Sequence, residues 1–234
     1  MKEINISPRL LSAADFVRQD AILADIGTDH AYLPLFLLRE GRIVRAFCSD
    51  INEGPLDSAR ANVGAAGYLD RVEFTLADGA DALAGKGITD YTICGMGGEL
   101  IADIIDRADE MRDPAVRLIL QPMTRRGALV SYLYKNGFEV LEEAYSKDAG
   151  KHYVTLLVAY SGNCRDTSEL EAEFGRADTP SRNPEAKLGY LKAKLGVFEK
   201  RRDGIERSSI GGEDYTPHVE YIKTLINEEE RRLK

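Results

Sequence analysis

The sequence predicts an α/β protein built on a mostly parallel sheet, with a helical appendage after it. Through residues 7–160, short apolar runs of strand length alternate with amphipathic stretches of helix length, which is the pattern of βαβ units. Two strands follow one another at the end of that region, which predicts an antiparallel edge to the sheet. Beyond residue 184 come two long amphipathic segments without a strand between them.

Size and composition limit the class of protein. The 234 residues suit one domain with an appendage or two small domains. No apolar run approaches the roughly 18 residues needed to cross a bilayer, and the N-terminal residues lack the apolar segment of a signal peptide. We therefore expect a cytoplasmic protein that does not enter a membrane. Cys48, Cys94 and Cys164 show no metal-ligand spacing, so we expect buried reduced thiols at the first two positions and no metal site.

The N-terminal elements indicate a ligand site. Ser7 and Pro8 are typical of a helix start. The apolar run 21–26 predicts a buried strand, and Gly27 allows a tight turn into a helix that begins at Tyr32. A strand, a turn with glycine and a helix form half of a nucleotide-binding βαβ unit, whose ligand lies at the carboxyl end of the strand.

The remaining elements follow from the same patterns. Further strands are expected at 43–51, 71–77, 91–94, 116–120, 138–145 and 152–160, and further helices at 55–66, 99–111, 129–134 and 168–174. Asp148, Ala149 and Gly150 join the last two strands as a hairpin. Seven strands with an antiparallel last pair are the plan of the Rossmann-like class I methyltransferase sheet, which we expect over residues 1–161.

Residues 162–234 are expected to form a second domain. Helices are predicted at 185–207 and 217–234, and a loop with glycines between them predicts an antiparallel, coiled-coil-like hairpin. The chain has a net charge of −8, but residues 187–207 carry seven basic and three acidic residues. Such a basic stripe is either a nucleic-acid footprint or a solvated helix face.

Acidic or polar residues follow four of the predicted parallel strands. They are Asp25 with Asp29, then Asp50, Asp78 and Gln121, and parallel strands bring such ends to one edge of the sheet. The spacing Gly-x-Gly-x-x-Gly is absent, so a pyrophosphate cofactor is not expected. Carboxylates suit a ligand with a sulfonium and an amino group, such as S-adenosylmethionine. The alternative is that each acid caps a helix, which explains one such residue more easily than four in register.

Each acid has an expected partner on that cofactor. Asp50 would hold both ribose hydroxyls, and Asp78 would accept a hydrogen bond from the adenine amino group while the Gly79 N–H faces a ring nitrogen. Asp25 and Asp29 would lie near the methionine end.

A glycine-rich stretch follows the strand at 91–94. Gly95-Met96-Gly97-Gly98 has no phosphate-binding lysine, and it lets the backbone approach a bound molecule closely. His30 and His152 are candidate general bases, but no spacing pairs either with a nucleophile, so we expect them to shape pockets.

Six short motifs carry a family resemblance. They are Ser7–Leu10, Ala24–Pro34, Asn52–Pro55, Ala77–Gly79, Gly95–Gly98 and Leu118–Pro122. Together they resemble the bacterial tRNA (adenine-N1)-methyltransferase family that modifies adenine 22, and the likeness continues through residues 150–153 and the C-terminal helices. The family usually has Asn after Gln121-Pro122, whereas this chain has Met123.

The resemblance implies a set of site residues. The cofactor-binding residues would be Asp25, Gly27, Thr28, Asp29, His30, Asp50, Ile51, Asn52, Ala77, Asp78, Gly79, Gly95, Met96 and Gly97, of which Asp29, Gly95 and Met96 would also position the reacting groups. The tRNA-binding residues would be Arg9, Gln121, Pro122, Tyr153, Lys200, Arg201 and Arg202. We expect a monomer that acts on tRNA.

The implied reaction agrees with these residue types. Adenine N1 carries a free lone pair at neutral pH, so methyl transfer needs alignment rather than a base, and the adenine must leave its stack to react. Two alternatives are a methyltransferase acting on a small molecule or another RNA, and a noncatalytic interaction protein. The first would close a lid over its pocket, and the second would have no reason to keep four acids at one edge.

Overall fold

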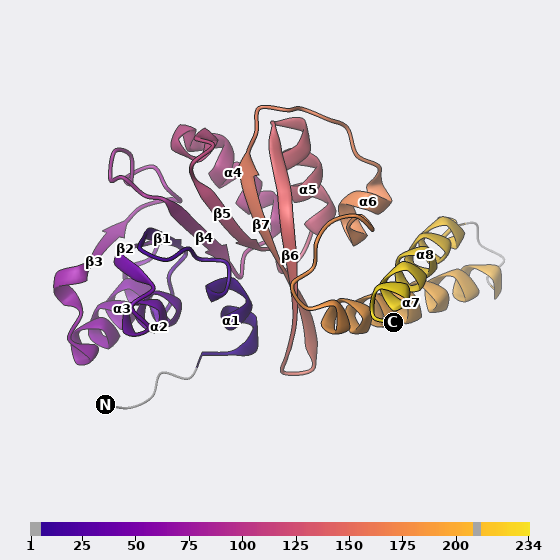
Figure 1. Cartoon of the computed structure of the whole chain (residues 1–234), viewed down its shortest axis with the longest axis horizontal. Coiled ribbons are helices and arrows are strands. Elements are labelled where there is room, and N and C mark those ends of the chain that lie inside the picture. Colours follow the sequence, from indigo (N-terminus) through magenta and orange to yellow (C-terminus); the bar gives the residue numbers. More distant parts are fainter. Residues whose placement is uncertain (1–5, 208–211) are drawn as a thin grey trace.

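A seven-stranded sheet forms the centre of the molecule (Figure 1). The computed structural model describes residues 6–207 and 212–234. The strands lie in the order β3 (Val72–Leu76), β2 (Ile43–Asp50), β1 (Ala21–Ile26), β4 (Asp90–Cys94), β5 (Arg117–Gln121), β7 (Lys151–Tyr160) and β6 (Phe138–Asp148). The first five strands are parallel, and β7 is antiparallel to both β5 and β6. The predicted Rossmann-like class I methyltransferase sheet is confirmed.

Helices cover both faces of the sheet (Figure 1). α1 (Pro8–Ala14), α2 (Tyr32–Arg39) and α3 (Glu53–Ala66) pack on one face, and α4 (Gly98–Arg107) and α5 (Arg126–Lys135) pack on the other. Two short 3-10 turns, η1 (Leu69–Arg71) and η2 (Asp109–Arg112), complete this part. The apolar sides of these helices therefore bury the central strands β1, β4 and β5, as a parallel sheet requires.

One predicted helix is wrong in extent. The sequence predicted a single helix over 99–111, but α4 ends before Ala108, whose backbone is extended at φ −109° and ψ 90°. The chain then continues as η2, and this break turns Met111 into the core, where it is fully buried. Burial of an apolar side chain outweighs the continued helical pattern here.

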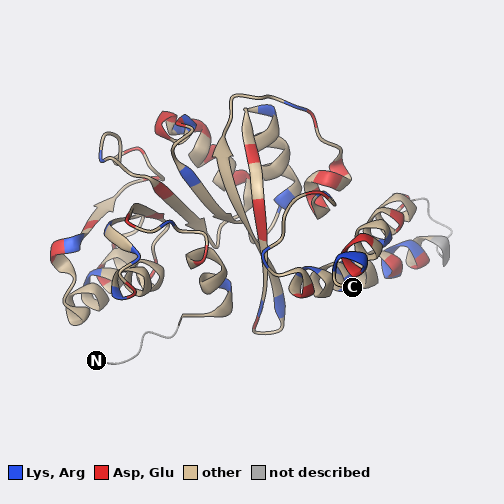
Figure 2. Ribbon diagram, viewed as in Figure 1, with Lys and Arg blue, Asp and Glu red and all other residues tan. Residues whose placement is uncertain are grey.

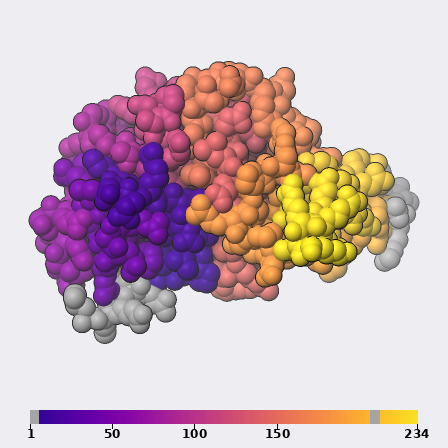
Figure 3. Space-filling view, viewed as in Figure 1, coloured from indigo at the N-terminus to yellow at the C-terminus, as the bar shows by residue number. Residues whose placement is uncertain are grey.

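The C-terminal helices form a hairpin that projects from one end of the molecule (Figures 1 and 3). α7 (Pro184–Arg207) and α8 (Thr216–Arg232) pack side by side. Lys187 of α7 and Glu229 of α8 form an ion pair of 3.3 Å, with side chains only 1% and 3% exposed. Removing one partner of such a pair leaves a buried charge unpaired, so this contact fixes how the two helices align.

The segment between the sheet and the hairpin packs on both of them. The Glu143 N–H donates to Pro180 O at 2.9 Å, and the Arg182 N–H donates to Glu143 O at 2.9 Å. The short helix α6 (Glu169–Phe174) packs on α5, and Phe174 is fully buried. Phe174 also packs on the rings of Phe198 and His218 in the hairpin. A cut at residue 161 would remove all these contacts, so we propose that residues 162–183 link the sheet to the hairpin rather than belonging to a separate C-terminal domain.

Charges on the hairpin are balanced rather than uniformly basic (Figure 2). Ion pairs join Lys192 to Glu230 at 2.9 Å and Lys223 to Glu199 at 3.2 Å. Within residues 6–207 and 212–234, no helix is long and apolar enough to span a membrane.

Candidate cofactor and substrate site

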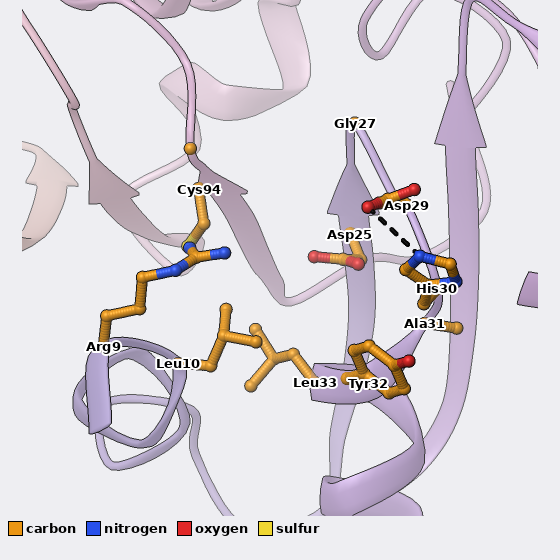
Figure 4. Close-up of a pocket in the computed structure, with 11 residues that line it drawn as sticks. Arg9, Leu10, Asp25, Gly27, Asp29, His30, Ala31, Tyr32, Leu33 and Cys94 are labelled. Carbon is orange, nitrogen blue, oxygen red and sulfur yellow. Dashed lines mark ion pairs between the residues drawn. The ribbon is translucent and has the colours of Figure 1, made fainter. Parts of the chain in front are cut away.

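A cavity of about 320 Å³ opens between the carboxyl ends of β1 and β4 (Figure 4). The strand order reverses at this point, with β2 on one side of β1 and β4 on the other, and α/β sheets bind ligands at such a switch point. The lining residues are Arg9, Leu10, Asp25, Gly27, Asp29, His30, Ala31, Tyr32, Leu33, Cys94 and Gly95. Residues far apart in the sequence thus meet at one edge of the sheet.

The turn after β1 depends on Gly27. Its φ is +75°, and a Cβ added there would lie 2.1 Å from Met96 Cε. The N–H groups of Gly27 and Thr28 donate to Ser49 O at 2.8 and 3.0 Å. Glycine is therefore needed both for the left-handed backbone and for the close approach of the Met96 side chain.

Asp25 is a buried carboxylate held by two hydroxyl groups. Thr28 Oγ1 donates to Asp25 Oδ2 at 2.6 Å, and Thr92 Oγ1 donates to Asp25 Oδ1 at 2.7 Å. Burial raises the pKa of Asp25, while the two hydroxyl hydrogen bonds act in the opposite direction. The carboxylate is thus fixed at the wall of the cavity (Figure 4).

The next carboxylate, Asp29, stands at the mouth of the cavity. Its side chain is 75% exposed and lies 3.5 Å from His30 Nε2, and the His30 ring stacks on Tyr32 with ring centroids 5.1 Å apart. Ala31 has a left-handed backbone, with φ +54°, directly before α2. Such strain in a residue other than glycine is typical of functional loops.

The opposite wall is the loop after β4. Gly95 has φ +87°, and a Cβ added there would meet no atom within 4 Å, so this backbone faces open space in the cavity. The Met96 carbonyl accepts a hydrogen bond from the Met123 N–H at 2.8 Å. A Cβ on Gly98 would lie 2.3 Å from Arg125 O. The loops after β4 and β5 are therefore packed directly against each other.

Arg9 reaches from α1 towards Cys94 across the cavity (Figure 4). Gln121 positions Arg9: its Nε2 donates to Arg9 O at 2.8 Å, and Arg9 Nη1 donates to Gln121 Oε1 at 3.3 Å. The Gln121 side chain also donates to Thr155 Oγ1 at 2.8 Å and is fully buried. Gln121 was expected to contact substrate, but these contacts make it a support for Arg9.

The remaining predicted cofactor residues lie along the same edge of the sheet, beside this cavity. Asp50 ends β2, and its Oδ1 accepts the Asn52 N–H at 2.8 Å. The Ala77 N–H donates to Asp50 O at 3.0 Å, which brings the end of β3 next to it. Asp78 pairs with Arg107 at 3.1 Å, and that hydrogen bond lowers the pKa of Asp78. Ile51 is largely exposed, whereas Gly79 is buried and its carbonyl accepts from Ser49 Oγ at 3.0 Å.

Comparison with known proteins identifies the family. The family of the methyltransferase domain matches residues 6–156. The tRNA (adenine(22)-N1)-methyltransferase of Bacillus subtilis is 35% identical over 164 residues, which are 70% of this chain and 68% of that protein. This chain belongs to the tRNA (adenine(22)-N1)-methyltransferase family.

Solved structures of family members have the same fold. Sp1610 of Streptococcus pneumoniae, described as a candidate tRNA (m1A22) methyltransferase, is 31% identical with a TM-score of 0.81, over 95% of this chain and 100% of that chain. Its complex with S-adenosyl-L-methionine gives 32% identity and a TM-score of 0.80, with the same coverage of both chains.

The predicted substrate residues of this family member other than Arg9 and Gln121 lie in two further places. Pro122 and Tyr153 line a second pocket, beyond the loop after β5. Lys200, Arg201 and Arg202 lie in the second half of α7, away from both pockets. The Arg201 guanidinium lies over the Phe198 ring at 5.2 Å, and Arg202 pairs with Asp203 at 2.8 Å.

The sequence did not point to every residue of this methyltransferase cavity. Leu10, Ala31, Tyr32, Leu33 and Cys94 also line it. Cys94 was expected to be a buried thiol inside a strand; it is partly exposed at the end of β4, where burial still raises its pKa. The position of Cys94 directly before Gly95 was the feature of the sequence that could have indicated its place in the cavity. Within residues 6–207 and 212–234, no three His, Cys, Asp or Glu side chains form a group that could hold a metal ion.

Proposed function

We propose that this chain transfers the methyl group of S-adenosylmethionine to N1 of adenine 22 in tRNA. The observation that carries this proposal is the cavity at the switch point of the sheet, where two carboxylates face a wall of glycine backbone. Membership of the tRNA (adenine(22)-N1)-methyltransferase family supports the same reaction.

The residues of the cavity fit S-adenosylmethionine. Asp25 and Asp29 offer negative charge to its amino and sulfonium groups, and the open side of Gly95 leaves room where a side chain would stand. Asp50, with Ile51 and Asn52, would hold the ribose. Asp78, with Ala77 and Gly79, would hold the adenine ring. The remaining residues of the cofactor site would be Thr28, His30, Met96 and Gly97.

The chain contributes positioning rather than proton transfer. When bound, S-adenosylmethionine supplies a methyl carbon on a cationic sulfur, and the adenine N1 lone pair takes that carbon as the carbon–sulfur bond breaks. Gly95 and Met96 would hold the flipped base in line with this bond, while Asp29 fixes the other end, so that alignment lowers the barrier. N1 is unprotonated at neutral pH, so no general base is required.

We further propose that Arg9 contacts the substrate at the mouth of the cavity and that a monomer grips tRNA with its hairpin. The candidate contacts on the hairpin are Lys200, Arg201 and Arg202. They lie in the second half of α7, which extends about 36 Å at 1.5 Å per residue and so places them away from the cavity. Reversing these three to Glu should flatten the slope of log affinity against log salt by roughly two units. An unchanged slope would remove them from the interface.

The direct test is transfer of labelled methyl from S-adenosylmethionine into bulk tRNA and into a metabolite extract. We expect label in tRNA only, recovered as 1-methyladenosine after digestion to nucleosides. Label in another nucleoside, or in the metabolite fraction, would contradict the proposal.

A further inference from the structure

A second cavity, of about 490 Å³, lies on the other side of the loop after β5. Five elements enclose it: that loop, the start of α5, the start of β7, α6 and the first half of α7. Its lining residues are Pro122, Met123, Thr124, Arg125, Arg126, Lys151, His152, Tyr153, Val154, Glu173, Tyr190 and Lys194. The function described so far uses only Pro122 and Tyr153 of this set.

This second cavity is coupled to the first through shared loops. Met123 lines the second cavity, and its N–H donates to the Met96 carbonyl at 2.8 Å. The Gly98 N–H donates to Thr124 O at 2.8 Å. One wall of the second cavity is therefore hydrogen-bonded to the glycine-rich loop of the first. The two cavities are therefore close enough for neighbouring units of one polymer to occupy them.

The lining of the second cavity is rich in basic residues, most of which are ion-paired. Arg125 pairs with Glu99 at 2.7 Å, Arg126 with Glu143, and Lys194 with Glu173 at 3.3 Å. Lys151 is exposed, and among the described residues it takes part in no ion pair. Lys151 is therefore available to contact a phosphodiester backbone, and Lys194 could exchange Glu173 for a phosphate.

Arg126 is the buried basic residue of this lining. It is only 7% exposed, and its guanidinium pairs with Glu143 and donates to Ala172 O at 2.8 Å. These contacts join the start of α5 to β6 and α6, so Arg126 supports the wall of the cavity.

The second cavity also presents aromatic rings. His152 and Tyr153 are both half-buried at the start of β7. Burial and the nearby Lys147 lower the pKa of His152, which leaves its ring uncharged at neutral pH. Rings of this kind stack on nucleobases.

Resting on the proposed function, we infer that this cavity binds the nucleotide that adjoins the methylated adenine. Lys151 and Lys194 contact its phosphates, and the ring of Tyr153 or His152 stacks on its base. This subsite would hold the strand while the adenine is turned into the first cavity, a step that otherwise costs unstacking energy.

The test compares two double charge reversals. Lys151→Glu with Lys194→Glu changes the cavity; Lys135→Glu with Lys86→Glu makes the same charge change at the opposite edge of the sheet. In each pair one lysine is ion-paired, Lys194 to Glu173 at 3.3 Å and Lys86 to Glu73 at 2.7 Å. We expect the cavity variant to raise the KM for tRNA about tenfold and to flatten the salt slope by roughly one and a half units relative to the control. Its affinity for S-adenosylmethionine should not change.

The outcomes separate this inference from the proposed function. If the wild-type chain methylates tRNA and the two double variants behave alike, the subsite is overturned and the proposed function stands. If the wild-type chain does not methylate tRNA, the proposed function itself fails. Should thermal melting show that Lys194→Glu unfolds the protein, Lys151→Glu against Lys135→Glu decides, because both residues are exposed on the surface.

Discussion

The two cavities differ in charge although they share a wall. The first sets Asp25 and Asp29 against Arg9, whereas the second contains Lys151 together with Arg125, Arg126 and Lys194, which pair with Glu99, Glu143 and Glu173. The hydrogen-bonded loops after β4 and β5 lie between them. The local charge of each cavity, and not the net charge of the chain, therefore decides which ligand suits it.

The two cavities are alike in how their backbone is built. In each, a parallel strand ends, a short loop follows, and a residue other than glycine takes a left-handed backbone before the next helix. These residues are Ala31, with φ +54°, and Arg125, with φ +57°. Strain of this kind persists only where the surrounding packing determines the loop, so both loops are rigid parts of the scaffold.

The largest effect on stability is expected from removing Arg126, the buried cation of the second cavity. Arg126→Met leaves Glu143 buried and unpaired, so we expect the free energy of unfolding to fall by about 3–5 kcal/mol. Urea denaturation measures this. Arg126→Met combined with Glu143→Leu should recover most of the loss, because neither charge then remains buried. A single variant as stable as wild type would contradict the role of the pair.

The cofactor side is tested by Asp50→Ala. We expect binding of S-adenosylmethionine to weaken by about 2 kcal/mol, the size of a lost charge-assisted hydrogen bond. Calorimetry on the folded variant measures it, and Asp57→Ala, an exposed acid in α3, is the control. Equal affinity in both variants would place the ribose elsewhere.

The aromatic part of the second cavity is tested by Tyr153→Leu. Loss of stacking should weaken tRNA binding by about 1 kcal/mol, measured as KM under steady-state conditions. Tyr153→Phe keeps the ring and should restore the wild-type value. If both variants lose affinity equally, the hydroxyl and not the ring is responsible.

Asp25→Asn tests the first cavity through the pH dependence of the protein's stability. Because burial raises the folded-state pKa of Asp25, the wild type loses stability as pH rises from the unfolded pKa through the folded one. The variant lacks this loss, so its stability relative to wild type should increase over that interval, while its affinity for S-adenosylmethionine falls. Urea denaturation across the acidic range would show the first effect. A relative stability that is independent of pH would mean that Asp25 is not destabilised by burial.

The smallest effect is expected on the hairpin surface. Lys192→Ala breaks an exposed pair with Glu230 and should cost less than about 1 kcal/mol of stability. A larger loss in thermal melting would show that this pair is coupled to the buried pair of Lys187 and Glu229.

The order and type of most elements could be predicted because they depend on local periodicity. The edge where Asp25, Asp50 and Asp78 lie follows from strands running in parallel, so it too was predictable. The break in α4 at Ala108 was not, because it depends on where Met111 finds space in the core. Periodicity contains no information on that packing.

Contacts between distant residues account for the rest of the difference. Gln121 stands at a strand end like the predicted ligands, but Arg9 and Thr155 occupy its amide group. The basic residues of 187–207 looked like a stripe, yet Lys187, Lys192 and Lys194 all pair with acids elsewhere in the chain. The residues of the second cavity come from five separate elements, so no single stretch of sequence indicated it.

The buried pair of Lys187 and Glu229 fixes the axial register of α7 against α8. Sliding one helix along the other by a turn would separate these charges and leave both buried. A change in length is therefore tolerated only when both helices gain or lose turns together, beyond the pair. Family members whose hairpins differ in length should therefore differ in matched steps of about 5.4 Å.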